Sequence, residues 1–466
     1  MSGSGSLTYG VAALARPTFD MAFAEEMRDK AFAALEAAGI RTVGPRALLS
    51  NAMAAGSAIA EIAAGGRIDA LLILQITFTD ATMTVRLAQA TSAPVAIWAV
   101  PEPRLGGRLR LNAFCGLNLA AHALGKAGIA HHWLYAAPNA SGLADSLRAF
   151  SEPATMAPTA ARAASGRSAA GLAALERIRG ARITVVGERP EGFDTCDYDE
   201  AELASMAGVA VNRVSLADLF GRAKAAPAAR VSAARARAAE KLAGLDRVDQ
   251  TELDRSLRLY CALKDLRGDS KGLAVRCWPE TFTEYGGAAC GPMAMMNEDR
   301  VPSACEADVY GSLSALILQE LAGEPSWMAD LVDLDVGDGT GVFWHCGLAP
   351  LSMCASGAPP EAAIHTNRKM PLLHQFPLKP GRFTLARLSR ARNRAKLVIG
   401  GGEFLERPMA FTGTSGVFRF DRPPESVLAT IIGEALEHHF AIAYGDHREA
   451  LRTIAANLEI PALEIA

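Results

Sequence analysis

Apolar and polar positions form alternating blocks along the first third of the chain. Residues 7–15 (LTYGVAALA) are apolar almost throughout, as in a buried strand, and residues 20–39 carry apolar side chains at helical spacing. The alternation continues with apolar runs at 70–76, 94–100 and 132–135 and with helical stretches at 80–92 and 116–127. Apolar strands that alternate with helices are typical of a parallel sheet covered on both faces.

The middle of the chain begins with a change in composition. Residues 153–181 are rich in Ala, Ser and Arg, and we expect a linker that runs into a helix. A second α/β unit starts at Ala181 with the buried-type strand RITVV. Residues 223–266 are helical in pattern and rich in Ala and Arg, but interleaved Asp and Glu indicate a solvated helix face rather than an RNA-binding one.

The last part of the chain has a different pattern. After residue 340, short strand-like runs such as GVFWHCG, RFTLARLS and GVFRFD are separated by Gly and Pro turns, which predicts a mainly β module. Residues 400–402 (GGG) follow the strand KLVI, where we expect a bulge or turn. The fold class is therefore α/β: two Rossmann-like parallel α/β domains (1–155 and 156–345) and a C-terminal β-rich, barrel-like domain (346–466).

Composition narrows the class of protein. The chain has 466 residues, 50% of them hydrophobic, and its 47 basic and 50 acidic residues give a net charge of -3, which argues against a nucleic-acid partner. The N-terminus lacks the pattern of a secretion signal, and no apolar run reaches the length of a membrane helix. The eight cysteines form no CxxC pair. We expect a cytoplasmic protein with free thiols and no membrane partner.

The common cofactor motifs are missing, and a set of acids and histidines remains. GxxxxGK[ST] and HExxH do not occur, no GxGxxG lies between a strand and a helix, and no GxSxG elbow joins a strand to a helix. Six of the nine histidines follow residue 340, among them His345, His438 and His439, and Glu306 and Asp330 precede them. Two carboxylates and a histidine suit Mn²⁺ or Mg²⁺ better than structural Zn²⁺. From the pattern alone, a helix cap or an ordinary hydrogen-bonded histidine explains each residue as well.

Three segments resemble the L-fucose isomerase and L-arabinose isomerase superfamily. They are residues 94–124 (PVAIWAVPEPRLGGRLRLNAFCGLNLAAHAL), 276–347 (with PSACEADVYG and VFWHCG) and 437–451 (EHHFAIAYGDHREAL). Each lies in a different predicted domain. The resemblance implies two α/β domains followed by a β-rich one. It also implies a homo-oligomer (a trimer, tetramer or hexamer) with its active site between domains and at a subunit interface.

The resemblance also implies a divalent metal, commonly Mn²⁺, with Mg²⁺ or another divalent cation as alternatives. Its ligands would be Glu306, Asp330 and His439, with His438 as the close alternative to His439. Asp rather than Glu at position 330 favours the fucose-type branch. Arabinose-type enzymes use a further histidine, a role that His345 could fill, and the sequence does not decide between the branches.

The implied reaction interconverts an aldose and a ketose through a cis-enediolate. A metal stabilises the developing oxyanion, and Glu306 and Asp330 would combine metal binding with proton transfer. Arg16 could hold an anionic or hydroxyl-rich end of the substrate or pair with Asp20, and Trp278 could stack on the sugar or fill a core. The sugar could be deoxy, branched or sulfonated. The alternatives are carbon–carbon cleavage or decarboxylation of a keto sugar acid by the same chemistry, and a non-catalytic sugar-binding protein.

Overall fold

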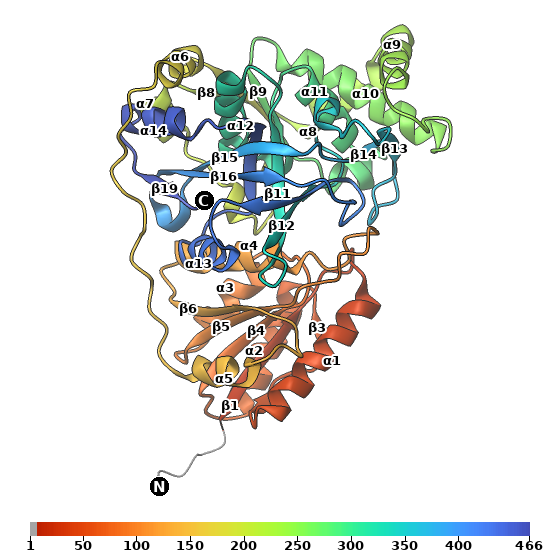
Figure 1. Cartoon of the computed structure of the whole chain (residues 1–466). Coiled ribbons are helices and arrows are strands. Elements are labelled where there is room, and N and C mark those ends of the chain that lie inside the picture. The colour runs from red at the N-terminus through yellow and green to blue at the C-terminus, as the bar shows by residue number, and fades with distance from the viewer. Residues whose placement is uncertain (1–6) are drawn as a thin grey trace.

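Three sheets organise residues 7–466, the part of the chain that this computed structural model describes (Figure 1). The first sheet lies at the opposite end of the molecule from the second, and the third lies between them, next to helix α4 (Figure 1). The position of a binding site depends on which strand ends these sheets bring together.

The first sheet is parallel, with strand order β2-β1-β4-β5-β6 and β3 paired to β1. Its strands are β1 (Thr8–Leu14), β2 (Arg41–Val43), β3 (Leu48–Leu49), β4 (Ala70–Gln75), β5 (Val95–Ala99) and β6 (His131–Tyr135). Its helices are α1 (Met21–Ala37), α2 (Ala52–Ala64), α3 (Thr82–Gln89), α4 (Ala113–Lys126) and α5 (Leu143–Arg148). Strands β2 and β4 lie on opposite sides of β1, so the strand order changes direction at β1. Parallel sheets bind ligands in the crevice that such a point leaves at the carboxyl ends of the two central strands, here β1 and β4.

The second sheet is also parallel, with strand order β10-β9-β7-β8. It contains β7 (Arg182–Val186), β8 (Ala210–Val214), β9 (Gly272–Val275) and β10 (Ser303–Ala304). The helices of this region are α6 (Ala169–Ile178), α7 (Glu200–Ala207), α8 (Leu216–Ala225), α9 (Ala228–Ala239), α10 (Gln250–Arg267), α11 (Cys290–Glu298) and α12 (Val309–Ala322). The predicted linker runs as extended chain along the outside of the molecule before α6 begins, and Arg162 forms a bridge with Ala462 there (Figure 1).

The third sheet is large and mixed. Its strands are β11 (Trp327–Asp335), β12 (Thr340–His345), β13 (Glu361–Ala363), β14 (Leu373–Pro377), β15 (Gly381–Ser389), β16 (Lys396–Phe404), β17 (Thr414–Phe420), β18 (His439–Tyr444) and β19 (Ala462–Glu464), with helices α13 (Pro424–Gly433) and α14 (Arg448–Asn457). Most neighbours are antiparallel, but β14–β17 and β16–β19 are parallel. Because β16 also pairs with β17, strands β17, β12, β11, β18, β15 and β16 form a closed circuit of pairings.

The α/β class, with parallel sheets and a large mixed sheet at the C-terminal end, agrees with the sequence prediction. The third sheet, however, already includes β11 and β12, which precede the boundary expected near residue 345. The expected bulge or turn at Gly400–Gly402 is wrong, because these residues lie inside β16. A Cβ at Gly402 would lie 2.3 Å from the carbonyl oxygen of Arg419, so the absence of side chains lets β17 approach β16 closely.

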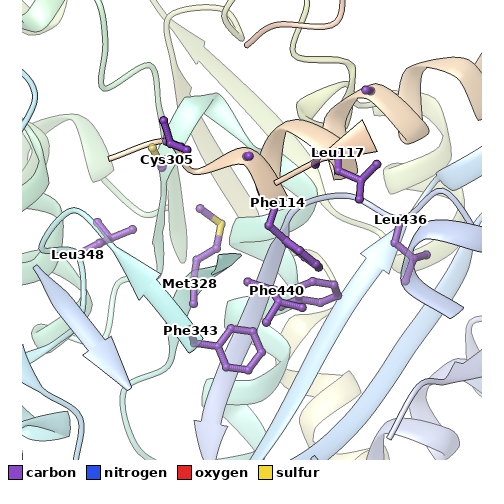
Figure 2. Packing of buried hydrophobic residues seen from close by; sticks show 14 of the residues in the cluster. Phe114, Leu117, Cys305, Met328, Phe343, Leu348, Leu436 and Phe440 are labelled. Carbon is purple, nitrogen blue, oxygen red and sulfur yellow. The ribbon is translucent and has the colours of Figure 1, made fainter. Parts of the chain in front are cut away.

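Helix α4 joins the first and third sheets. Cys115 of α4 lies with its Sγ 3.5 Å from the carbonyl oxygen of Leu331 in β11. Phe114 of the same helix points toward Phe440 of β18, within one buried apolar cluster (Figure 2). This continuous core fixes the ends of β1 and β4 relative to β11 and β18. In the described residues, no helix is long and apolar enough to cross a membrane.

Candidate active site

A pocket lies where the three sheets meet. The loop after β1 contributes to its wall, as do the segments that follow β9 and β10 and strands β11, β12 and β18. The predicted site residues on this wall are Arg16, Trp278, Glu306, Asp330, His345 and His439. Titratable groups converge on one side of the pocket, as they do in many small-molecule sites.

Glu306 follows directly on β10, in the short turn Cys305–Ala307, and its side chain is buried. Its backbone is left-handed, with φ 58° and ψ 26°, and Ala307 also has a positive φ of 56°. Such a conformation costs about 1–2 kcal/mol per non-glycine residue, so the surrounding contacts must hold it. Trp278 donates from Nε1 to Glu306 Oε1 at 2.9 Å. The carboxylate is thereby fixed in orientation.

Asp330 and His439 are cross-strand neighbours in the register of β11 and β18. His439 Nε2 lies 3.3 Å from Asp330 Oδ1 and 3.8 Å from Glu306 Oε2. Among the described residues, Asp330 Oδ1 is buried and has no hydrogen-bond partner. Burial raises the pKa of Asp330 to about 6; the two histidines lower it, and the Glu306 charge adds to the rise. A buried carboxylate oxygen without a hydrogen-bond donor fits the role of a cation ligand.

His438 contacts the same glutamate from the residue before β18. Its Nε2 lies 3.2 Å from Glu306 Oε2, and its ring packs beside Phe78 and Phe193. Burial raises the pKa of Glu306, but the hydrogen bond from His438 and the charges of both histidines outweigh it and bring the pKa to about 2. Glu306 therefore stays ionised, with His438 as one of its hydrogen-bond donors.

Sequence reasoning missed two residues behind His439. Asp308 accepts a hydrogen bond from His439 Nδ1 at 2.9 Å, and its other oxygen accepts from Gly311 N at the start of α12. Arg387 of β15 is fully buried and donates to Asp308 Oδ2 and to the carbonyl oxygen of Thr195. Burial raises the pKa of Asp308, but Arg387 and His439 outweigh it and hold it well below its usual range. The carboxylate thus orients His439, as outer carboxylates orient metal-binding histidines.

A signal for both residues is present in the sequence. Asp308 stands in the same CEADV motif as Glu306, and Arg387 occupies the same strand face as the buried Phe383 and Leu385. A charged residue at a core-facing strand position requires a buried partner.

The three predicted substrate-binding residues line the pocket in different ways. Arg16 does not pair with Asp20, because Asp20 forms an ion pair with Arg110. Instead, Nη2 of Arg16 lies 3.5 Å from Oδ2 of Asp80. Trp278 presents its ring to the pocket while its indole nitrogen binds Glu306. His345, at the end of β12, accepts a hydrogen bond from Cys346 N at Nδ1 (2.9 Å). Its buried Nε2 has no partner within residues 7–466.

Three groups of side chains bring potential metal ligands close together. Two belong to this cluster: Asp330 with His438 and His439, and Glu306 with His439 and Cys196. The third consists of Cys290, Cys346 and His365 on the pocket wall, where His365 Nδ1 already accepts hydrogen bonds from the backbone N–H groups of residues 367 and 368. All eight cysteines are free thiols, as expected. The oxygen and nitrogen donors around His439 match a hard divalent cation.

Comparisons with known proteins found two matching family models and several similar proteins. A family model described as fucose/sulfoquinovose isomerase, N-terminal domain, matches residues 10–160, and one described as L-fucose isomerase, C-terminal domain, matches residues 373–466. A sulfoquinovose isomerase of Alkalicoccus urumqiensis is 30% identical over 403 residues, which is 85% of this chain and 86% of that protein. Sulfoquinovose isomerases of Priestia megaterium (29% identity over 96% of each chain) and of Clostridium sp. (29% over 84% of this chain and 85% of that one) are also similar.

Proposed function

Because the chain belongs to the fucose and sulfoquinovose isomerase family, whose members interconvert aldoses and ketoses, we propose that it is a metal-dependent isomerase of a sulfonated hexose. The observation that carries the proposal is the orphaned Oδ1 of Asp330, buried beside His439 and Glu306 on the pocket wall. The named relatives supply the substrate class, since their sugar carries a sulfonate group. The cytoplasm is the location we propose for it.

We assign the metal to Glu306, Asp330 and His439, with Mn²⁺ as the proposed ion and Mg²⁺ as its alternative. His439 suits the ligand role better than His438. Its Nδ1–H is taken up by Asp308, which leaves the Nε2 lone pair facing both carboxylates. His438 instead uses Nε2 to donate to Glu306. When bound, a divalent ion at these groups acts as a Lewis acid toward the two sugar oxygens at C1 and C2.

The carboxylates differ in what they can do for the proton transfers. Conversion of an aldose to a ketose moves a proton from C2 to C1 and a hydroxyl proton from O2 to O1. Both Glu306 oxygens already accept hydrogen bonds, from Trp278 and His438, so this group keeps its charge. Asp330 has no such donor on Oδ1 among the described residues, so we assign to its carboxylate, beside its role as a ligand, the proton that moves between C2 and C1.

His345 supplies a hydrogen-bond donor in this scheme. Because Cys346 N donates to Nδ1, a neutral His345 carries its proton on Nε2, which is buried and lines the pocket. An Nε2–H group in that position would donate to a substrate oxygen as negative charge develops on it. This role differs from that of a metal ligand, which the sequence had left open for His345.

The proposal is tested by reconstitution. Protein stripped of metal by a chelator should gain ketose-forming activity on sulfoquinovose when Mn²⁺ is added. The variant Glu306→Gln should regain neither the metal nor the activity, whereas Asp246→Asn, a change of an exposed carboxylate, should regain both. Formation of carbon dioxide or of a shortened product would instead favour cleavage chemistry. Binding without turnover would favour a sugar-binding protein.

The proposed homo-oligomer, with its interface active site, is tested by sedimentation of the same protein.

A further inference from the structure

Two arginines lie against the same tryptophan in the pocket. The guanidinium carbon of Arg16 is 4.9 Å from the centre of the Trp278 ring, and that of Arg368 is 5.0 Å from it. Arg16 comes from the loop after β1 and Arg368 from the segment between β13 and β14, so distant parts of the chain converge here. Positive charges placed together in this way repel one another unless an anion joins them.

The protein itself supplies little negative charge to this pair. The contact of Arg16 with Asp80 is long, at 3.5 Å, and Asp80 also accepts a hydrogen bond from Thr82 N. Within the described part of the chain, Arg368 forms no ion pair with a carboxylate, and its guanidinium carbon also lies 5.3 Å from the centre of the Phe282 ring. Guanidinium groups in aromatic surroundings keep several donors free for a planar or tetrahedral oxyanion.

The segment that carries Arg368 is held in place. His365 is buried, and its Nδ1 accepts hydrogen bonds from Asn367 N at 3.2 Å and from Arg368 N at 3.3 Å. Its ring packs edge-on against Phe282, with the ring centres 5.4 Å apart. The backbone at Arg368 is therefore pre-arranged rather than an open loop, which reduces the cost of ordering the side chain around a ligand.

Trp278 relates this pair to the metal-binding carboxylate. Its Nε1 binds Glu306, while both guanidinium groups lie over its ring, about 5 Å from the ring centre. A sugar whose C1 and C2 lie at Glu306 and Asp330 would thus extend along the indole toward the arginines. We infer that Arg368 and Arg16 form an anion subsite that binds the sulfonate on the far end of the hexose and selects sulfonated over neutral sugars. This inference rests on the proposed function for the identity of the sugar.

The test compares two substrates in one variant. Arg368→Gln should lower the ratio of kcat/KM for sulfoquinovose to kcat/KM for 6-deoxyglucose by about 100-fold, as expected when one partner of a buried charged contact is removed. Arg368→Lys should recover part of the ratio, because it restores the charge without the paired donors. Arg394→Gln, which alters an exposed arginine, should leave the ratio as in the wild type. An unchanged ratio in Arg368→Gln, or an equal loss for both sugars, would overturn the subsite.

A binding measurement separates this inference from the proposed reaction. Methanesulfonate carries the anion without the sugar, and its binding to the Mn²⁺-loaded protein can be followed by the fluorescence of Trp278 and the other tryptophans. Binding to the wild type that weakens at least 10-fold in Arg368→Gln supports the subsite even if no sugar is isomerised. Methanesulfonate binding that is equal in both proteins contradicts the subsite, whether or not the wild type is an isomerase.

Discussion

His439 donates its Nδ1–H to Oδ2 of Asp308 across 2.9 Å, and this contact turns Nε2 of the same ring toward Glu306 and Asp330. The acceptor is anchored in turn by the buried Arg387 and by the first turn of α12. In the proposed metal site, the orientation of His439 thus depends on Asp308, which contacts the ring on the side away from Glu306 and Asp330.

Substitution of Asp308 by Asn tests that dependence. The amide can present N–H to His439 Nδ1, which would move the imidazole proton to Nε2 and remove the lone pair from the metal side. We expect Mn²⁺ affinity to fall by about 10–100-fold, measured by titration of the metal-free protein. Asp246→Asn is the matched control, and thermal unfolding without metal reports the separate effect of leaving Arg387 unpaired. Unchanged affinity in a folded Asp308→Asn protein would contradict the orienting role.

Substitution of His345 distinguishes a donor from a ligand. His345→Gln can place an amide N–H near the pocket, whereas His345→Ala cannot. If His345 donates to a substrate oxygen, both variants keep a full complement of Mn²⁺. The Ala variant then loses about 10²–10³-fold in kcat, and the Gln variant loses less. Loss of bound metal in both variants, measured by elemental analysis, would make His345 a ligand.

Replacement of Trp278 by Phe removes one hydrogen bond and keeps an aromatic face. Glu306 Oε1 then lacks its donor, while the two arginines still have a ring to pack against. Hydrogen bonds to charged groups contribute about 1.5–3 kcal/mol, so kcat should fall by roughly 10–100-fold. The KM for a sulfonated sugar should change far less. If instead KM rises with kcat unchanged, Trp278 serves mainly to bind the sugar.

The buried pair of Lys396 and Glu434 gives a pH-dependent stability. Their charged atoms lie 2.7 Å apart, and Glu434 also accepts a hydrogen bond from Thr159 in the linker. Burial raises the pKa of Glu434, but the bonds to Lys396 and the linker outweigh it, so its pKa is lowered overall. The stabilisation is therefore present above the unfolded value of about 4.3 and is lost as the pH falls through the lower folded value.

Glu434→Gln should cost about 3 kcal/mol at pH 7, because it leaves Lys396 buried without its counter-charge. The difference from the wild type should shrink as the pH is lowered from about 5 to 3, as followed by urea unfolding at several pH values. The double variant Lys396→Met/Glu434→Leu should regain much of the loss, since both charges are removed together. A difference that grows toward acid pH would reverse the sign of the argument.

The sequence predicted the class of fold, but it did not predict how the candidate site residues meet. Continuous apolar strands between amphipathic stretches were sufficient for the parallel sheets. The choice between His438 and His439 was not accessible, because neighbouring residues share the same motif and only the contact with Asp308 separates them. Asp308 itself was overlooked because the left-handed backbone at Glu306 and Ala307 brings residues 306 and 308 to one histidine. No local sequence pattern predicts the positive φ angles of these two residues.

The remaining differences arise from long-range pairing. From the sequence, the segments of β11 and β12 were assigned to the end of the central domain. In the structure β11 pairs with β18 and β12 with β17, which places Asp330 and His345 in the third sheet. The sequence did not predict a role for Arg368, because its segment has no periodic pattern of apolar residues. Arg16, with which it shares the pocket, lies near the other end of the chain. Contacts of this kind depend on tertiary structure, which a one-dimensional pattern does not contain.

The central claim, that this chain isomerises a sulfonated hexose by moving a proton between C2 and C1, is tested most directly by isotope incorporation. The Mn²⁺-loaded protein is incubated with sulfoquinovose in D₂O, and the equilibrated sugars are examined by NMR. The account predicts a 6-sulfonated ketose among the products, with deuterium at C1 of the ketose and at C2 of the recovered aldose to the extent that the base exchanges its proton with solvent. Asp330→Asn should show neither product nor label. Carbon dioxide, a shortened product, or an unchanged and unlabelled sugar with the metal-loaded wild type would contradict it.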